Sequence, residues 1–265
     1  MKRVLLFDLD ETLMVEEPAA VASFEATAQF AATCREVDAQ SLAAGARSRA
    51  RELWYSAPTH DYCMRVGISS WEGMWCRFEG DGSDERALRE WSPNYRREAW
   101  RLALADQMID DPDLAEELGE QFPAERRARH EVFADVAPAL TQLQRSHTLA
   151  IVTNGAACLQ REKLASSDLE SHFETIVVSA DVGIAKPDAS VFEHALSQLG
   201  ADRDRTVMVG DSIPKDVDGA LAAGLGAVWV NRHGSCTPAG RHDLVEISNL
   251  SDLPEVLDGL ASAST

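Results

Sequence analysis

Cysteine is scarce in this chain of 265 residues, and its few copies are not spaced like metal ligands. No two of them form a C-x-x-C pair, and none stands near histidine at the spacing of a structural zinc site. These absences argue against a zinc finger and against a disulfide-stabilised secreted fold. We expect five reduced thiols, at Cys34, Cys63, Cys76, Cys158 and Cys236.

Positive charge and long apolar runs are also lacking. Lysine and arginine number 25 against 44 acidic residues, which gives a formal net charge of −19. Such an acidic surface repels nucleic acid and anionic lipid, so we expect neither as a partner. A ligand that carries phosphate would need a local positive site, which a metal ion can provide.

No apolar stretch approaches the roughly 20 residues needed to cross a membrane, and no basic start leads into an apolar signal region. We therefore expect a cytoplasmic location. The chain is 45% hydrophobic and 26% charged, values typical of a globular protein rather than a disordered one. No feature of the sequence indicates an oligomeric state.

The second half of the chain alternates apolar strands with amphipathic helices. This pattern predicts an α/β fold with a parallel, Rossmann-like sheet. We expect helices at Ala189–Leu199 and Val217–Ala223, and Arg3–Leu9 as a further, central strand. The other expected strands are Leu149–Thr153, Thr175–Ser179, Thr206–Val209, Ala227–Val230 and Leu244–Ile247.

Between Met14 and about His130 the alternation disappears, and apolar residues recur mostly at helical spacing. We expect residues 14–130 to form a helical lobe inserted after the first strand, and residues 1–13 and 131–265 to form the α/β core. In open α/β sheets the ligand site lies at the carboxyl ends of the strands. The lobe is therefore expected to be a cap over that end.

The segment "FDLDETL" places three acids within four positions, at Asp8, Asp10 and Glu11. If the strand continues to Leu9, alternate residues point to the same side, so Asp8 and Asp10 would share a pocket. Their mutual repulsion then requires a positive partner. Glu11 would point away, toward a local structural contact.

Four predicted strand ends carry polar motifs in a recognisable order: "DLDET", "TNG" at Thr153–Gly155, "KPD" at Lys186–Asp188 and "GDSIPKD" at Gly210–Asp216. Each motif alone is weakly informative, but the ordered set resembles the haloacid dehalogenase superfamily of aspartate-nucleophile phosphatases. The resemblance covers the core, about half of the chain. Its nearest subgroup includes N-acylneuraminate-9-phosphatase and the pyrimidine 5′-nucleotidases.

A carboxylate at a strand end, such as Asp8, can attack phosphorus if its charge and that of the phosphate are offset. Asp211, after Gly210 at the end of another strand, is the natural second carboxylate for Mg²⁺. The resemblance implies that the backbone carbonyl of Asp10 is the third protein ligand. It also implies that Asp8 forms an aspartyl phosphate.

The resemblance further implies that Asp10 is a general acid and then a general base. The branch of the superfamily that acts on aliphatic halides lacks an acid here, because halide leaves without a proton. Asp10 therefore favours phosphate ester chemistry over dehalogenation.

The remaining core residues would bind phosphate. We expect the Thr153 hydroxyl and the N–H groups of Asn154 and Gly155 to hold phosphate oxygens, with Lys186 completing the site. Thr153, Asn154 and Lys186 are accordingly counted with Asp8 and Asp10 as catalytic. Asp216 would support the metal or Lys186 from a second layer, and Asp188 would cap the following helix.

Within the lobe, glycine and serine interrupt a helical pattern between Arg65 and Trp75. Related lobes place a substrate-contacting loop there, so Arg65, Ser69, Ser70 and Trp71 are candidate specificity residues. The tryptophans of the lobe are expected mainly to pack its core. The lobe contains no lysine, which argues against the Schiff-base chemistry of phosphonate-cleaving relatives.

These observations favour a Mg²⁺-dependent phosphatase that hydrolyses a small phosphomonoester, either a sugar phosphate or a nucleoside monophosphate. A sugar phosphomutase would use the same residues and remains an alternative. A non-catalytic ligand-binding protein on this scaffold is a third possibility. The sequence does not identify the substrate.

Overall fold

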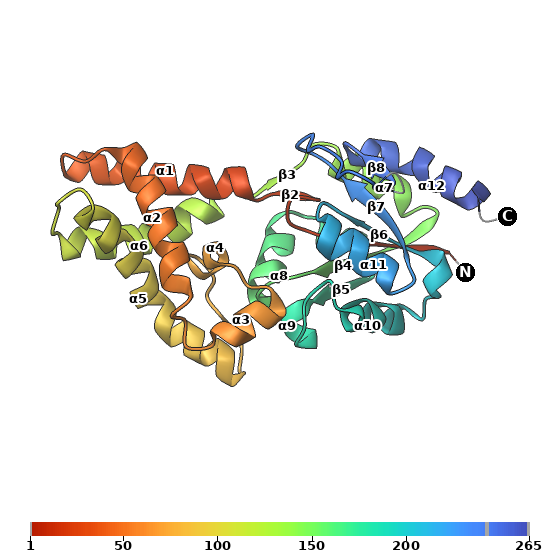
Figure 1. Cartoon of the computed structure of the whole chain (residues 1–265), viewed down its shortest axis with the longest axis horizontal. Coiled ribbons are helices and arrows are strands. Elements are labelled where there is room, and N and C mark those ends of the chain that lie inside the picture. The colour runs from red at the N-terminus through yellow and green to blue at the C-terminus, as the bar shows by residue number, and fades with distance from the viewer. Residues whose placement is uncertain (1, 242–243, 264–265) are drawn as a thin grey trace. The chain divides into compact units, whose positions relative to one another are not determined.

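The computed structural model describes residues 2–241 and 244–263 and contains two compact units (Figure 1). We call the described residues within 1–15, 132–154 and 164–265 the sheet unit. The helical unit comprises Glu16–Glu131 and Gly155–Lys163. The segment 155–163 thus groups with the helices, although the sequence pattern assigns it to the core.

The sheet unit contains six parallel strands in the order β5-β4-β1-β6-β7-β8. Their bounds are β1 (Arg3–Phe7), β4 (His147–Thr153), β5 (Thr175–Val178), β6 (Thr206–Gly210), β7 (Gly226–Val230) and β8 (Glu246–Ile247). The predicted parallel α/β fold with the first strand inside the sheet is confirmed. Three strands are shorter than expected: β1 ends at Phe7 rather than Leu9, β5 ends at Val178 rather than Ser179, and β8 begins at Glu246 rather than Leu244.

Side chains of β1 alternate between two hydrophobic cores, one on each face of the sheet. Leu5 and Phe7 belong to a core that includes residues of α7 (Val136–Leu143) and α12 (Leu253–Ala263). Val4 and Leu6 belong to the other core, with residues of α10 (Ala189–Leu199) and α11 (Asp218–Ala222). Burial on both faces explains the nearly continuous apolar run before Asp8.

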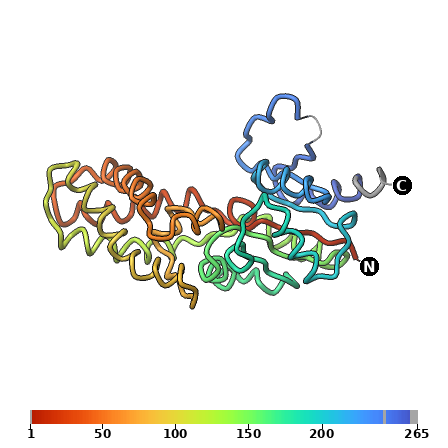
Figure 2. Tube along the Cα trace, turned by 60° about the horizontal axis from the view of Figure 1, so that its bottom comes forward, coloured from red at the N-terminus to blue at the C-terminus, as the bar shows by residue number. Residues whose placement is uncertain are grey.

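Shorter elements complete the sheet unit. Helix α9 (Ser179–Val182) follows β5, and a π-helical turn covers Ile213–Val217. The helix expected at Val217–Ala223 is therefore divided between this turn and α11. Residues 231–241, in the connection between β7 and β8, follow a wide loop (Figure 2). Asn231 holds its base, because its Nδ2 donates to Ser235 O and to Glu246 Oε1 at 2.8 and 2.7 Å.

The helical unit contains six helices and the first part of a seventh among its described residues. They are α1 (Glu17–Cys34), α2 (Ala39–Trp54), α3 (His60–Val66), α4 (Ser70–Gly73), α5 (Ser83–Ala105), α6 (Pro112–Arg127) and the start of α8 (Ala157–Ser166). Trp54, Trp75 and Trp100 are buried, and Trp91 stacks on Tyr95 with ring centroids 4.6 Å apart. The tryptophans therefore mainly pack this unit, as expected.

Two short strands, β2 (Met14–Val15) and β3 (Glu131–Val132), pair with each other.

None of the helices in the described part of the chain is both long and apolar enough to cross a membrane.

The central position of β1 yields a stability prediction. Leu5 is fully buried, so Leu5→Ala should destabilise the sheet unit by about 2–5 kcal/mol, through lost apolar burial and the cavity left behind. Leu221→Ala is the matched control, because Leu221 is 47% exposed and its truncation should cost less than about 0.5 kcal/mol. Urea unfolding followed by circular dichroism measures both, and equal transition midpoints would contradict the assignment of Leu5 to the core.

Candidate active site

Three neighbouring strands of the sheet end beside predicted site residues. Asp8 follows β1, Thr153 is the last residue of β4, and Asp211 follows β6. Because the carboxyl ends of parallel strands meet at one edge, these residues share that edge. The Asp8 N–H donates to Val209 O at 3.0 Å, which holds the start of the acidic motif against β6.

Lys186 joins two carboxylates at this edge. Its Nζ lies 2.6 Å from Asp8 Oδ1 and 2.7 Å from Asp216 Oδ1. Lys186 is 4% exposed and Asp216 is 1% exposed, so bulk water screens these ion pairs poorly. Carboxylate oxygens of Asp8, Asp211 and Asp216 lie within 4.8 Å of one another. One lysine therefore faces three carboxyl groups.

This imbalance of charge changes the proton affinities of the cluster. Burial raises the pKa of Asp8; Lys186 opposes that effect and Asp216 adds to it. Burial also raises the pKa of Asp211, and the charges of Asp8 and Asp216 raise it further. For Lys186, burial acts to lower the pKa, but Asp216 and Asp8 outweigh it and raise the pKa above its usual value. The lysine stays protonated while the acids repel one another.

The donor set fits a hard divalent cation. Carboxylate oxygens are the ligands that Mg²⁺ prefers, and a cation among them would relieve the repulsion that raises the pKa values of Asp8 and Asp211. Asp216 lies in the same cluster, where its Oδ2 accepts from the Ser212 N–H at 2.9 Å and its Oδ1 contacts Lys186. Asp216 thus contacts Lys186, and its support of a metal ion stays a prediction.

Close packing at Gly210 explains the glycine before Asp211. A Cβ atom at position 210 would lie 2.4 Å from Cγ of Asp216, too close for any side chain without movement of that carboxylate.

Asp10 reaches the site by a turn rather than by strand alternation. Because β1 ends at Phe7, the expected strand alternation does not extend to Asp8 and Asp10. Asp10 instead forms an isolated bridge with Met14, and the Leu13 and Met14 N–H groups both donate to Leu9 O. The turn places the backbone of Asp10 directly after the buried Leu9.

Glu11 makes a long-range structural contact rather than the local one expected of it. It adopts a positive φ of 58°, a left-handed conformation that is uncommon for residues other than glycine. Its Oε2 lies 2.9 Å from Nε2 of His233.

Asn154 orients Lys186 through its backbone. The Asn154 side chain accepts from the Lys186 N–H at 2.8 Å and donates to Lys186 O at 3.1 Å. Thr153 is 1% exposed and ends β4. These side-chain hydrogen bonds are additional to the backbone role expected of Asn154.

Gly155 differs from its expected role. Its N–H donates to Val66 O at 3.2 Å, so this structure does not offer it to a phosphate oxygen. Gly155 has φ of 129°, and a Cβ there would lie 2.4 Å from Oε1 of Glu72. This positive φ, which L side chains rarely adopt, accounts for glycine at this position.

Three further residues position Asp211, and the sequence analysis assigned none of them to the site. The Asp211 N–H donates to Oγ1 of Thr12 at 3.0 Å, and Nε1 of Trp229 donates to Asp211 O at 2.8 Å. Arg232 donates to Thr12 O from Nε and Nη2, at 2.9 and 2.7 Å, and forms an ion pair with Asp135. Thr12 belongs to the "DLDET" motif, whereas no local pattern marks Trp229 or Arg232.

The candidate specificity residues have structural contacts within the helical unit. The Ser69 side chain caps α4 by accepting from the Glu72 N–H at 3.3 Å, and Glu72 returns the contact to the Ser69 N–H. The Arg47 guanidinium lies 4.4 Å from the centre of the Trp71 ring, and that of Arg65 lies 5.7 Å from the Tyr62 ring. Ser70 accepts from Tyr95 Oη through its carbonyl at 2.9 Å.

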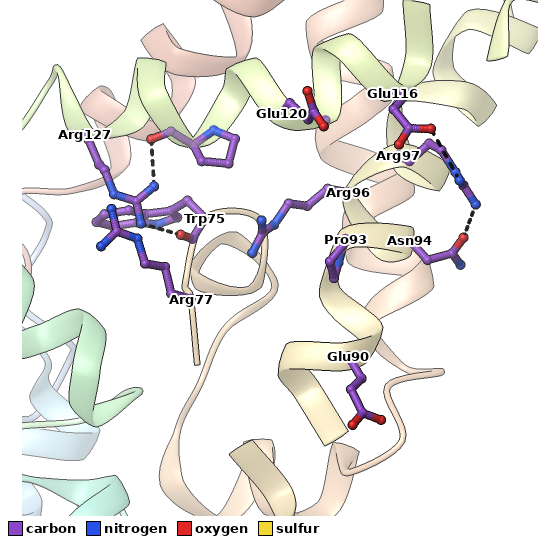
Figure 3. Close-up of a pocket in the computed structure, with 12 residues that line it drawn as sticks. Trp75, Arg77, Glu90, Pro93, Asn94, Arg96, Arg97, Glu116, Glu120 and Arg127 are labelled. Carbon is purple, nitrogen blue, oxygen red and sulfur yellow. Dashed lines mark hydrogen bonds and ion pairs between the residues drawn. The ribbon is translucent and has the colours of Figure 1, made fainter. Parts of the chain in front are cut away.

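A separate cavity of about 510 Å³ lies within the helical unit, lined mainly by α5 and α6 (Figure 3). Its lining mixes arginine and glutamate side chains. Arg97 pairs with Glu116 at 3.5 Å, and Arg127 donates to Trp75 O at 2.9 Å and to Pro123 O at 3.2 Å. Much of the positive charge around this cavity is therefore engaged in contacts within the unit.

Comparison with known proteins agrees with this geometry. A family model of haloacid dehalogenase-like hydrolases matches residues 2–224. The chain belongs to this family. Phosphoserine phosphatase of Thermus thermophilus is 36% identical over 231 residues, which cover 87% of this chain and 89% of that protein. The family predicted from the four motifs is confirmed.

Other relatives match shorter regions. Pyrimidine 5′-nucleotidase YjjG of Escherichia coli is 36% identical over 44% of this chain and 53% of its own length. N-acylneuraminate-9-phosphatase of Rattus norvegicus is 32% identical over 62% of this chain and 68% of its own length. These relatives confirm the predicted subgroup, and the phosphatases among them confirm the prediction of a phosphoric monoester hydrolase.

Solved structures share the fold over nearly the whole chain. The 2-haloacid dehalogenase of Pseudomonas syringae is 28% identical, with a TM-score of 0.62, over 97% of this chain and 99% of that one. A phosphatase of the same superfamily from Thermococcus onnurineus is 26% identical, with a TM-score of 0.54, over 98% of this chain and 99% of that one.

The contact between Thr12 and Asp211 yields a prediction. Thr12→Val keeps the shape of the side chain but leaves the Asp211 N–H without its acceptor, so Asp211 should be oriented less well. We expect divalent metal affinity, measured by titration calorimetry, to fall about 10- to 100-fold. Thr12→Ser retains the hydroxyl and should bind metal like the parent protein. Equal affinities for the valine and serine variants would show that the hydroxyl does not position Asp211.

Proposed function

We propose that this protein is a Mg²⁺-dependent phosphatase that hydrolyses a small phosphomonoester through an aspartyl phosphate on Asp8. The observation that carries the proposal is the buried contact of Lys186 with Asp8, beside Asp211 and Asp216. A nucleophilic carboxylate with an adjacent fixed cation and a potential metal site is what phosphoryl transfer requires, because that reaction depends mainly on positioning and charge neutralisation.

In the first step, a carboxylate oxygen of Asp8 forms a bond to phosphorus while the bond to the ester oxygen breaks. Asp10 donates its proton to the departing oxygen, so the alcohol leaves neutral. Lys186 lies against Asp8 and offsets negative charge on the transferring group. Thr153 and the backbone of Asn154 bind phosphate oxygens at the adjacent strand end.

In the second step, water attacks the phosphorus of the aspartyl phosphate, and the bond from phosphorus to the Asp8 oxygen breaks. Asp10, now a carboxylate, accepts the proton from that water and regains its starting state. When bound by Asp8, Asp211 and the carbonyl of Asp10, Mg²⁺ supplies positive charge that allows an anionic nucleophile to approach an anionic phosphate. Asn154, Thr12 and Trp229 keep Lys186 and Asp211 oriented throughout.

The likeness to a 2-haloacid dehalogenase does not favour dehalogenation. Asp10 supplies an acid after the nucleophile, and a departing halide needs no proton, whereas a departing alkoxide does. The phosphatases among the sequence relatives point the same way. Asp10 is therefore the residue that best separates the two reaction classes.

We propose a class of substrates, small phosphomonoesters, rather than a single metabolite. Sugar phosphates and nucleoside monophosphates follow from the predicted subgroup, and the relative that matches 87% of the chain adds phosphoserine to the candidates. We propose that the helical unit acts as a cap that limits access to small substrates. The proposed cellular location is the cytoplasm.

A phosphate-release screen tests the proposal. Purified protein with Mg²⁺ should release inorganic phosphate from at least one member of a panel of sugar phosphates, nucleoside monophosphates and phosphoserine, and EDTA should abolish that release until excess Mg²⁺ is restored. No release from the whole panel would support a non-catalytic binding protein. Sustained isomerisation of a hexose phosphate without phosphate release would support a phosphomutase.

Paired variants test the two aspartates. Asp8→Asn removes the nucleophile and should reduce turnover to background, whereas Asp10→Asn should lower kcat by about 10²–10⁴-fold because proton transfer is lost in both steps. Quenching the Asp10 variant early in the reaction should trap phosphate on Asp8, detected by mass spectrometry. The Leu221→Ala variant serves as an active control, since Leu221 is exposed. Substantial turnover by the Asp8→Asn variant would refute the nucleophile assignment.

A further inference from the structure

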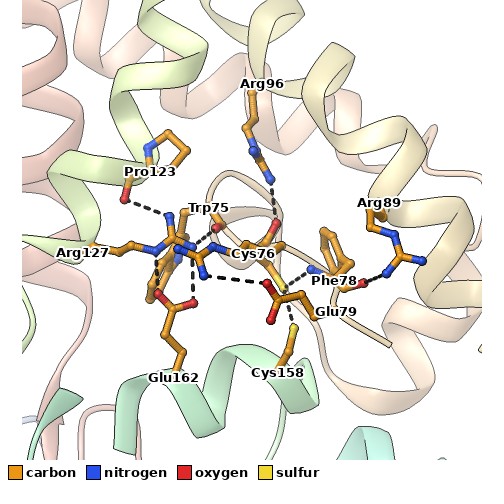
Figure 4. Close-up of polar contacts among 11 residues, drawn as sticks. Trp75, Cys76, Phe78, Glu79, Arg89, Arg96, Pro123, Arg127, Cys158 and Glu162 are labelled. Carbon is orange, nitrogen blue, oxygen red and sulfur yellow. Dashed lines mark hydrogen bonds and ion pairs between the residues drawn. The ribbon is translucent and has the colours of Figure 1, made fainter. Parts of the chain in front are cut away.

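Two cysteines that are 82 positions apart in the sequence meet inside the helical unit (Figure 4). Sγ of Cys76 lies 3.5 Å from Sγ of Cys158, within hydrogen-bonding range for sulfur. Cys76 follows α4, and Cys158 is the second residue of α8. No spacing motif in the sequence indicates this pair.

The backbone around Cys76 is held in place by polar contacts. Nη2 of Arg96 donates to Cys76 O at 2.6 Å, and the Phe78 N–H donates to Cys76 Sγ at 3.3 Å. Phe78 itself adopts a positive φ of 51°, which turns the chain back over the sulfur atom. Cys76 is fully buried, so its thiol is shielded from reagents in solvent.

Cys158 differs from Cys76 in both exposure and charge. It is partly exposed and lies in the first turn of α8, where the helix dipole favours an anion. A hydrogen bond with the Cys76 thiol, opposed by partial burial, lowers the pKa of Cys158 to about 7. Burial raises the pKa of Cys76 well above its usual value. The pair thus combines an accessible thiolate with a buried thiol that points at it.

The chain segments that carry the two sulfur atoms are also fastened to each other. The Gly155 N–H donates to Val66 O at 3.2 Å, and the Ala156 N–H donates to Oε1 of Glu72 at 3.4 Å. Arg127 pairs with Glu162 of α8 at 2.5 Å while donating to Trp75 O. These contacts lie on both sides of the sulfur pair and keep the two thiols close without a covalent bond.

We propose that Cys158 and Cys76 form a peroxide-sensitive dithiol site that closes to an intramolecular disulfide. The oxidant is a hydroperoxide. The Cys158 thiolate attacks the terminal peroxide oxygen and breaks the O–O bond; Cys158 becomes a sulfenic acid, and the other oxygen leaves as water or an alcohol after taking a proton. The Cys76 sulfur then attacks the Cys158 sulfur, its own proton goes to the departing hydroxide, and water is released. Two thiols and one peroxide thus give one disulfide, one water and a second water or an alcohol.

This site does not use the phosphatase residues, since neither cysteine contacts the cluster of Asp8, Lys186, Asp211 and Asp216 in the described part of the chain. Oxidation of the two cysteines would change how α8 is held. A disulfide would replace a hydrogen-bonding contact with a covalent bond between the first turn of α8 and the segment after α4. The anchoring of α8 would then depend on the redox state of the protein.

Peptide mapping of the full-length protein tests the proposal. After brief treatment with hydrogen peroxide, non-reduced digests should contain a peptide pair linked through Cys76 and Cys158, lighter than its parts by two hydrogen atoms, and dithiothreitol should remove it. Exposed Cys236 is the internal control, because it has no partner sulfur in the described contacts. Oxidation of Cys236 without formation of the linked pair would overturn the proposal.

Variants with one cysteine replaced test which of the two sulfur atoms reacts first with peroxide. Cys76→Ser should leave a sulfenic acid on Cys158 that dimedone traps, whereas Cys158→Ser should slow peroxide modification of Cys76 by about tenfold or more, since the buried thiol has no accessible thiolate beside it. Cys236→Ser is the matched control and should form the linked pair at the parental rate. Equal peroxide reactivity of Cys76 with and without Cys158 would contradict the assigned roles. If a variant does not fold, the mapping of the unaltered protein still decides whether the disulfide forms.

Discussion

The site depends on an excess of negative charge at one edge of the sheet. Lys186 lies within 2.7 Å of carboxylates from Asp8 and Asp216, and Asp211 belongs to the same cluster, so one fixed cation faces three acids. Removing charges from water is costly, and a single lysine cannot compensate all three carboxylates. Burial raises the pKa values of Asp8 and Asp211, and the charge imbalance of the cluster raises them further. A divalent cation would resolve it, which links the metal and nucleophile proposals to one physical cause.

Main-chain anchoring holds that unfavourable cluster together. Asp8 is tied to β6 through Val209, Lys186 is held by the amide of Asn154, and Asp211 is held by Thr12 and Trp229. Each anchor connects segments that are distant in sequence but adjacent in the parallel sheet. The repulsion among the acids is therefore opposed by the packing of the whole sheet, including the two cores on either side of β1.

The sequence predicts this fold well where one residue pattern dominates. Continuous apolar runs specified the parallel strands, and four short motifs in order specified the family. The end of β1 was misplaced because Leu9 is buried and apolar even though it lies beyond the strand. The residues that hold Asp211 could not be predicted from the sequence. Trp229 has the pattern of an ordinary strand residue, and Arg232 contacts Thr12 only in the folded sheet unit. Long-range pairs such as Cys76 and Cys158 leave no local trace either.

Helix α8 connects the chemistry of the two units through the chain itself. Thr153 ends β4 and Asn154 follows it in the sheet unit, yet the next residue, Gly155, already bonds to Val66 of the helical unit. In α8, Glu162 pairs with Arg127 and Lys163 pairs with Glu16. The "TNG" motif is therefore divided between the units: Thr153 and Asn154 belong to the sheet unit, and Gly155 belongs to the helical unit. Only one peptide bond separates Asn154, whose side chain holds the backbone of Lys186, from Gly155, whose N–H is held by Val66 of the helical unit.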